Sequence, residues 1–161
     1  MGHAMGGSPE GKPVMVKREV EEMTDKLHTM LTKPGRLRTR IREEELRKER
    51  LYYSLLPSGI RYDMDKVRSS PRDPMPLYIA EAEEIEELIR SLKAELQKAE
   101  AEILSAITVL DKAGADIIRY RYVNGLSWEA VAREVSYSRA QTFRRYREAV
   151  TRLDQSLSSG K

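Results

Sequence analysis

The chain has 161 residues, of which 40% are hydrophobic, 34% are charged and only 6% are aromatic. So few large apolar side chains exclude a single large core and favour an elongated, all-helical protein. Cysteine is absent, which excludes disulfide bonds, zinc sites built from thiolates and cysteine nucleophiles.

The net charge of +3 hides a change of sign along the chain. Residues 1–79 carry 16 Lys and Arg against 12 Asp and Glu, residues 80–111 carry 3 against 9, and residues 112–161 carry 10 against 5. The basic C-terminal segment favours a nucleic-acid partner, whereas the acidic middle segment cannot lie against phosphate.

Both ends of the chain are expected to lack fixed structure. Residues 1–13 are glycine-rich and predict a disordered leader, and residues 156–161 predict a disordered tail. No apolar run is long enough to span a membrane, and no secretory signal is visible. We therefore expect a cytoplasmic protein with no membrane partner.

Residues 14–56 predict two N-terminal helices separated by a break. Lys33-Pro34-Gly35 is expected to end the first helix, over residues 14–32, because proline and glycine both disfavour helix. The second helix is expected over residues 36–56 and needs a partner, because its middle is very polar. Apolar residues at steps of three and four define the first helix: Val16, Val20, Met23, Leu27 and Met30.

Residues 57–76 contain four prolines and predict a loop. Residues 77–111 then follow the heptad spacing of a coiled-coil helix without interruption. Its partner is expected to be residues 36–56, folded back as an antiparallel hairpin, or a second chain. The heptad positions are Ala82, Ile85, Ile89, Leu92, Leu96, Ala99, Ile103, Ala106 and Leu110.

Residues 112–155 predict three short helices. A break at 112–115 precedes the first, over 116–123, which is expected to stop at Asn124-Gly125. Ser127 is the expected N-cap of the second helix, which runs to Val135. Ser138 caps the third and forms a capping box with Gln141. The third helix is expected to face inward with Thr142, Tyr146, Ala149, Val150 and Leu153.

The tight turn between the last two helices is typical of a helix-turn-helix, whose second helix lies in the major groove of DNA. Five arginines and one acid lie between Ser138 and Arg152. Arginine is suited to two-pronged contacts with guanine or phosphate. The candidate DNA-binding residues are Ser136, Tyr137, Ser138, Arg139, Gln141, Arg144, Arg145 and Arg147, and Arg139 and Gln141 in the first turn are the expected base contacts. A generic basic helix face or a protein-binding module is the alternative.

The segment IIRYRYVNGLSWEAVAREVSYSRAQTF resembles region 4 of bacterial sigma factors. It is closer to phage-encoded regulators of the RinA and ArpU type, and the resemblance extends over about residues 37–153. It implies transcriptional control of phage or prophage genes in a bacterial cytosol, through promoter DNA and RNA polymerase. Ser136 replaces the glycine usual in such turns, which predicts a left-handed backbone there. By position, the resemblance implies that Arg139, Gln141, Thr142 and Arg144 face DNA, although Thr142 and Arg145 replace aliphatic residues.

The residues offer no sign of catalysis, so we expect no enzyme activity, cofactor or metal. Neither histidine belongs to a cluster with the spacing of metal ligands, and no glycine-rich phosphate loop is present. We predict a sequence-specific DNA-binding regulator whose partners are double-stranded DNA, RNA polymerase and a second copy joined through the coiled coil. A DNA-packaging recognition subunit resembling a small terminase and a polymerase-binding adaptor are the alternatives.

Overall fold

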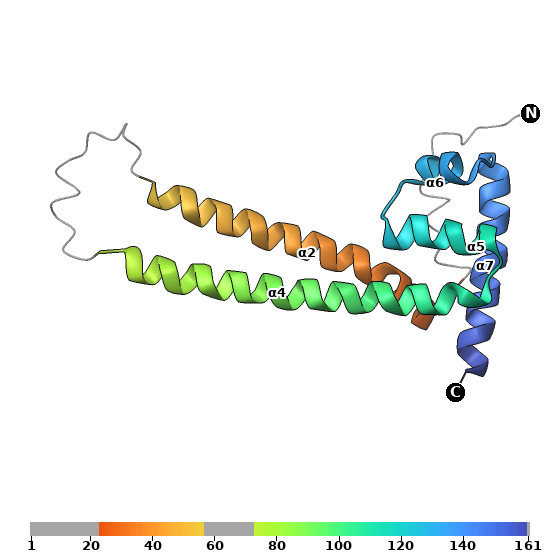
Figure 1. Cartoon of the computed structure of the whole chain (residues 1–161), viewed down its shortest axis with the longest axis horizontal. Helices are drawn as coiled ribbons and strands as arrows, with labels where there is room; N and C mark the ends of the chain where they lie inside the picture. The colour runs from red at the N-terminus through yellow and green to blue at the C-terminus, as the bar shows by residue number, and fades with distance from the viewer. Residues whose placement is uncertain (1–22, 57–72, 161) are drawn as a thin grey trace, which may run out of the picture. The chain divides into compact units, whose positions relative to one another are not determined.

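The computed structural model describes residues 23–56 and 73–160, and these residues contain helices and no strand (Figure 1). This confirms the all-helical fold class. The predicted leader, the helix before residue 23 and residues 57–72 of the loop lie outside the described residues. The elements are α2 (Asp25–Leu55), α4 (Met75–Ala106), the 3-10 turn η2 (Ile107–Val109), α5 (Lys112–Ile118), the π-helical turn η3 (Arg119–Val123), α6 (Trp128–Val135) and α7 (Arg139–Ser159).

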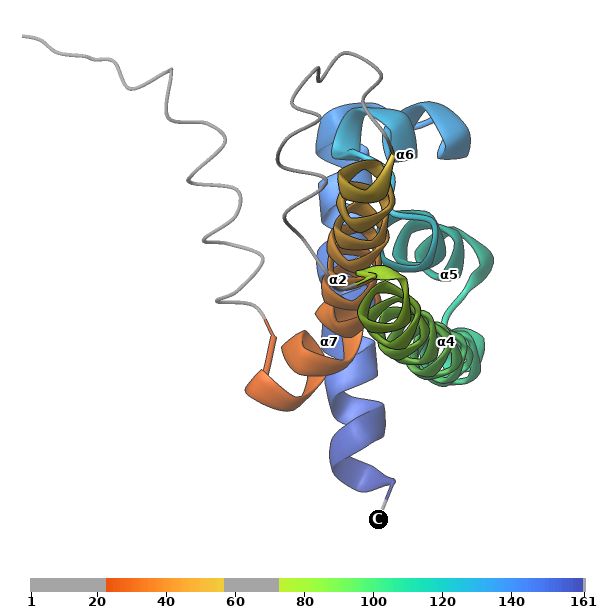
Figure 2. The same cartoon turned by 90° about the vertical axis from the view of Figure 1, so that its left-hand side faces the viewer.

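The chain divides into two compact units. Unit 1 comprises Met1–Gly35 and Lys98–Lys161, and unit 2 comprises Arg36–Gln97. Within unit 1, α5, α6 and α7 pack against one another (Figures 1 and 2). The first turns of α2 belong to the same hydrophobic core, to which they contribute Leu27 and Leu31.

An aromatic cluster lies at the centre of unit 1. The rings of Trp128 and Tyr146 meet edge to face with centroids 4.8 Å apart, and Trp128 lies 4.7 Å from Phe143. The hydroxyls of Tyr122 and Tyr146 form a buried hydrogen bond of 2.8 Å, so neither polar tip is left unsatisfied. The prediction that Trp128 and Tyr146 are core residues is confirmed.

Pro34 and Gly35 do not end the first helix, contrary to the prediction. Helix α2 runs without a break from Asp25 to Leu55 and contains Pro34 in its interior. Proline removes one backbone hydrogen bond and costs about 3 kcal/mol in a helix interior. Leu31 is buried in unit 1 and Leu37 in unit 2, so packing on both sides of the proline offsets this cost.

The predicted break at residues 112–115 is also wrong, because α5 begins at Lys112. The sequence argument missed the N-cap Asp111, whose carboxylate accepts a hydrogen bond of 2.8 Å from the Gly114 N–H. Other boundaries move by a few residues. Helix α4 begins at Met75, inside the predicted loop, and ends at Ala106, whereas α7 continues to Ser159, through most of the predicted tail.

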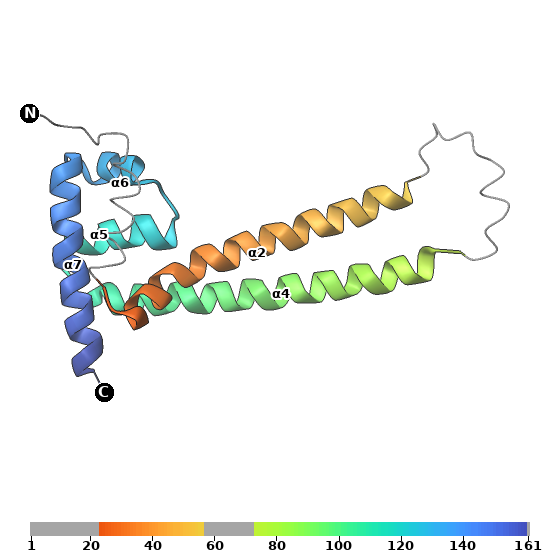
Figure 3. The same ribbon diagram turned by 180° about the vertical axis from the view of Figure 1, so that it is seen from behind.

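In unit 2 the two chain segments run antiparallel, as Figure 3 shows. Glu45 pairs with Lys93, whereas Arg47 and Lys48, which come later on α2, pair with Glu81 and Glu86, which come earlier on α4. The predicted heptad positions Ile85, Ile89 and Leu92 are buried, together with Leu37 and Ile41. At these positions the apolar seam is therefore covered within one chain.

The close approach of α5 to α7 makes Gly114 a sensitive position. A Cβ there would lie 3.3 Å from the Ala149 Cβ and 3.0 Å from Asp111 Oδ1. Overpacking of this kind costs about 1–3 kcal/mol, which exceeds the helix-propensity gain of about 1 kcal/mol. Gly114→Ala is therefore expected to lower the free energy of unfolding in urea by about 1 kcal/mol.

Gly35→Ala is the matched control, because a Cβ at this helical glycine meets nothing within 4 Å. It should stabilise the protein by up to about 1 kcal/mol. Equal effects of the two substitutions would contradict the close contact at Gly114.

Candidate nucleic-acid interface

The connection between α6 and α7 is a tight turn of three residues, Ser136–Ser138. Ser136 adopts the left-handed conformation (φ 60°, ψ 39°), as the sequence predicted. The turn is held by backbone hydrogen bonds from Ser136 to Arg133 and from Tyr137 to Ala132. The sharp change of chain direction is therefore built into the backbone.

Serine caps fix the first turns of both helices, which confirms the predicted caps. Ser127 Oγ accepts a hydrogen bond of 3.2 Å from the Ala130 N–H. Ser138 Oγ accepts one of 3.1 Å from the Gln141 N–H, and Gln141 Oε1 accepts one of 3.0 Å from the Ser138 N–H. This reciprocal capping box orders the start of α7.

One face of α7 is buried in unit 1, and it includes a predicted DNA contact. Thr142 is only 1% exposed, and its hydroxyl donates a hydrogen bond of 2.8 Å to the Ser138 carbonyl. The inward face predicted from the spacing is therefore confirmed, and the DNA contact that the resemblance implied for Thr142 is wrong. Its hydroxyl is satisfied locally, so the helix tolerates threonine where an aliphatic residue is usual. The other buried residues of this face are Tyr146, Ala149, Val150 and Leu153.

The opposite face of α7 is polar and centres on Arg144. At about 100° per residue, Arg144 lies opposite the middle of the buried face, and Arg147 lies beside it. Both side chains are exposed. Arg139, in the first turn, is also exposed and lies 3.8 Å from Glu129 of α6. An exposed pair at this distance is weak and leaves the guanidinium accessible to an anion.

Gln141 is less suited to contact a base than the sequence indicated. Two-pronged recognition of adenine uses both the carbonyl oxygen and the amide nitrogen of a glutamine side chain. The carbonyl oxygen is already engaged in the capping box. A two-pronged contact would therefore require this cap to open.

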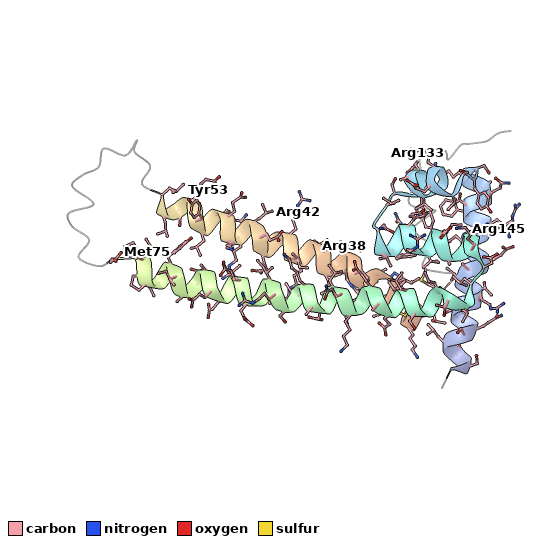
Figure 4. All side chains as sticks on the ribbon, in the orientation of Figure 1. Arg38, Arg42, Tyr53, Met75, Arg133 and Arg145 are labelled. Carbon is pink, nitrogen blue, oxygen red and sulfur yellow. The ribbon has the colours of Figure 1, made fainter. Side chains whose placement is uncertain are left out.

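Arg145 lies apart from Arg144 and lines a groove of about 510 Å³ between α7 and the segment that leads into α5. Its guanidinium is 3.6 Å from Glu148, and Asp111, Arg147 and Arg152 line the same groove. Arg145 is labelled in Figure 4. The structure thus separates two neighbouring arginines that the sequence places in one cluster.

Arg133 is an exposed cation that the sequence argument did not single out. It lies in the last turn of α6, three residues before the turn, and is labelled in Figure 4. Its neighbours Ser136 and Ser138 are exposed, and Tyr137 is half-buried. An isolated arginine in an amphipathic helix carries little signal, so only its place beside the turn identifies it.

The carboxylate of Asp116, on α5, accepts two charged hydrogen bonds. One of 2.8 Å comes from Arg119 and one of 3.1 Å comes from Lys112. Burial acts to raise the pKa of Asp116, but the two cations outweigh it, so the pKa lies below its usual value. The charged form thus stabilises the fold above the pKa of the unfolded chain, about 4. This stability is lost as the pH falls through the lower, folded-state pKa.

Comparison with models of protein families, with curated proteins and with solved structures finds no match for this chain. Among residues 23–56 and 73–160, no three His, Asp or Glu side chains are grouped so as to hold a metal ion. No helix within these ranges is both long and apolar enough to cross a membrane.

Ser136→Gly should stabilise the protein, because glycine adopts the left-handed conformation without the steric cost of a Cβ. The expected gain in unfolding free energy is about 1 kcal/mol, measured by urea denaturation. Ser136→Ala is the control and should bring no gain, because alanine keeps the Cβ. Similar gains from both would mean that the serine side chain itself was unfavourable.

Asp116→Asn should make stability less dependent on acid pH. The wild type is expected to lose unfolding free energy between pH 6 and about pH 2 as Asp116 is protonated. The variant should start lower at pH 6 and show a smaller loss. Glu134→Gln is the control, because Glu134 is an exposed carboxyl of α6 that forms no ion pair among the described residues. This variant should keep the wild-type dependence of unfolding free energy on pH.

Proposed function

We propose that the chain is a sequence-specific DNA-binding transcriptional regulator whose helix-turn-helix is formed by α6 and α7. The observation that carries this proposal is the geometry of α7. A capped helix with one face buried presents Arg144 and Arg147 on the opposite face, directly after a rigid turn. Recognition helices place their first turns against base edges in the same way.

The exposed residues divide into two roles. Arg139 and Arg144 are the proposed base-contacting residues, because they lie on the first two turns of α7 and guanine accepts two-pronged contacts from arginine. Arg133 and Arg147 are the proposed phosphate contacts. The hydroxyls of Ser136, Tyr137 and Ser138 and the N–H groups at the start of α7 also favour a phosphate.

The remaining parts follow from the resemblance to phage regulators of the RinA and ArpU type. We propose that the antiparallel helices of unit 2 form a coiled-coil hairpin that contacts RNA polymerase or a second copy, and that the targets are phage or prophage promoters. A packaging subunit and a polymerase-binding adaptor are the competing functions. A ring of eight or more chains in sedimentation would favour packaging.

DNA selection from a random library with the purified full chain tests the proposal. We expect an enriched motif, and Arg144→Ala should weaken binding to this motif by about 1–3 kcal/mol while relaxing preference at one or two positions. Arg152→Ala is the matched control on the same helix, two turns further on, and should leave the motif unchanged. Absence of any enriched motif would contradict the proposal and favour the adaptor.

A further inference from the structure

An ion pair joins the first turns of the two helices that form the helix-turn-helix. Arg139 Nη1 lies 3.8 Å from Glu129 Oε2. Glu129 lies in the first turn of α6, and Arg139 is the first residue of α7. Both side chains are about half exposed, so the pair faces outward at the place where α7 begins.

The backbone that carries each partner of this pair is already ordered. The Ser127 cap fixes the turn that carries Glu129. The capping box of Ser138 and Gln141 fixes the turn that carries Arg139. The two charges are therefore brought together by the way in which the two helices begin.

The stability of the fold alone does not explain this pair. Aromatic contacts of Trp128 with Phe143 and Tyr146 already join α6 to α7, and an exposed ion pair adds little to them. Arg139 also lies at the positive end of the α7 dipole, where a cation is unfavourable, and the first turn of α7 holds no acid. Glu129 offsets this cost only in part, so a ligand accounts for an arginine here better than the fold does.

A phosphate and a guanine meet different conditions at Arg139. A phosphate carries a full negative charge, which the carboxylate of Glu129 repels. Salt does not screen this repulsion, because the 3.8 Å between the pair is well below the Debye length of about 8 Å. Guanine instead offers two uncharged acceptors in the major groove, to which arginine binds in a two-pronged way. Glu129 therefore disfavours a phosphate more than a guanine.

We propose that Glu129 determines DNA specificity by directing Arg139 to a guanine and excluding the phosphate backbone as its partner. This inference rests on the DNA-binding function proposed above. A repulsive element against the wrong partner raises specificity in the same way as a better contact with the right one. Glu129 is thus a positioning residue that acts through Arg139 and lowers the affinity for DNA in general.

The test compares two variants of the full chain with the same change of charge. Glu129→Gln removes the carboxylate of the pair. Glu134→Gln removes an exposed carboxylate from the last turn of the same helix, one that forms no ion pair among the described residues. Affinity is measured between about 50 and 300 mM KCl on the motif that the wild type selects and on unrelated DNA. Selection with Arg139→Ala identifies the base position that Arg139 reads.

Glu129→Gln should bind unrelated DNA about twofold to fivefold more tightly than the wild type. The slope of log affinity against log salt should steepen by about one on this DNA, because Arg139 gains a phosphate. At the position read by Arg139, the preference for guanine should fall by about threefold or more. Glu134→Gln should change both affinities by the same factor and keep the preference.

The direction of these changes separates specificity from a structural role. If Glu129 only stabilised the fold, its loss would weaken binding to both DNAs, and this result would overturn the proposal. An unchanged guanine preference, or equal effects of the two glutamine variants, would also overturn it. In an Arg139→Ala background, Glu129→Gln should leave base preference unchanged. A remaining change there would mean that Glu129 contacts a base by itself, contrary to the proposal.

The same measurements separate this inference from the function on which it rests. Arg144→Ala is the reference variant for the helix-turn-helix. If Arg144→Ala alters the selected motif and Glu129→Gln does not, the role of Glu129 is refuted and the DNA-binding function stands. If the wild type selects no motif, the DNA-binding function itself fails and the role of Glu129 fails with it.

Discussion

The packing of Tyr146 between Trp128, Phe143 and Tyr122 is the contact on which unit 1 depends. Three elements supply these rings: η3, α6 and α7. Because Tyr146 is only 1% exposed, it fixes the rotation of α7 about its own axis. That rotation buries Thr142 and turns Arg144 outward. The arrangement of the candidate DNA-binding face is thus a consequence of how one tyrosine is buried.

The turn before α7 adds a second constraint. Ser136 in the left-handed conformation and the capping box of Ser138 and Gln141 set where α7 begins. The same hydrogen bond that orders the helix start occupies the Gln141 carbonyl oxygen. The capping box thus occupies the atom that a two-pronged base contact by Gln141 would need, and for this reason Arg139 and Arg144 are the proposed base contacts.

Local signals in the sequence were sufficient for the segment from Ser127 onward. Its caps, its left-handed turn and its core residues Trp128 and Tyr146 depend on neighbours a few positions away, and the structure confirms them. The spacing placed Thr142 inward, and only the resemblance assigned it to DNA, whereas Arg145 was grouped with Arg144 because the two are neighbours in the sequence. The groove that Arg145 lines is formed with Val109 to Asp111, before α5, which sequence spacing alone does not reveal.

The sequence by itself determined the helical class, the heptad seam and the alternation of charge, because each follows from periodicity or composition. Only tertiary packing decided that α2 continues through Pro34 and Gly35. Tertiary packing also divides the residues at the heptad positions between the cores of two units. Ile85, Ile89 and Leu92 are buried in unit 2, whereas Ile103 joins the core of unit 1. The physical reason is that helix breaking is a local cost of a few kcal/mol, which burial on both sides of the break can exceed.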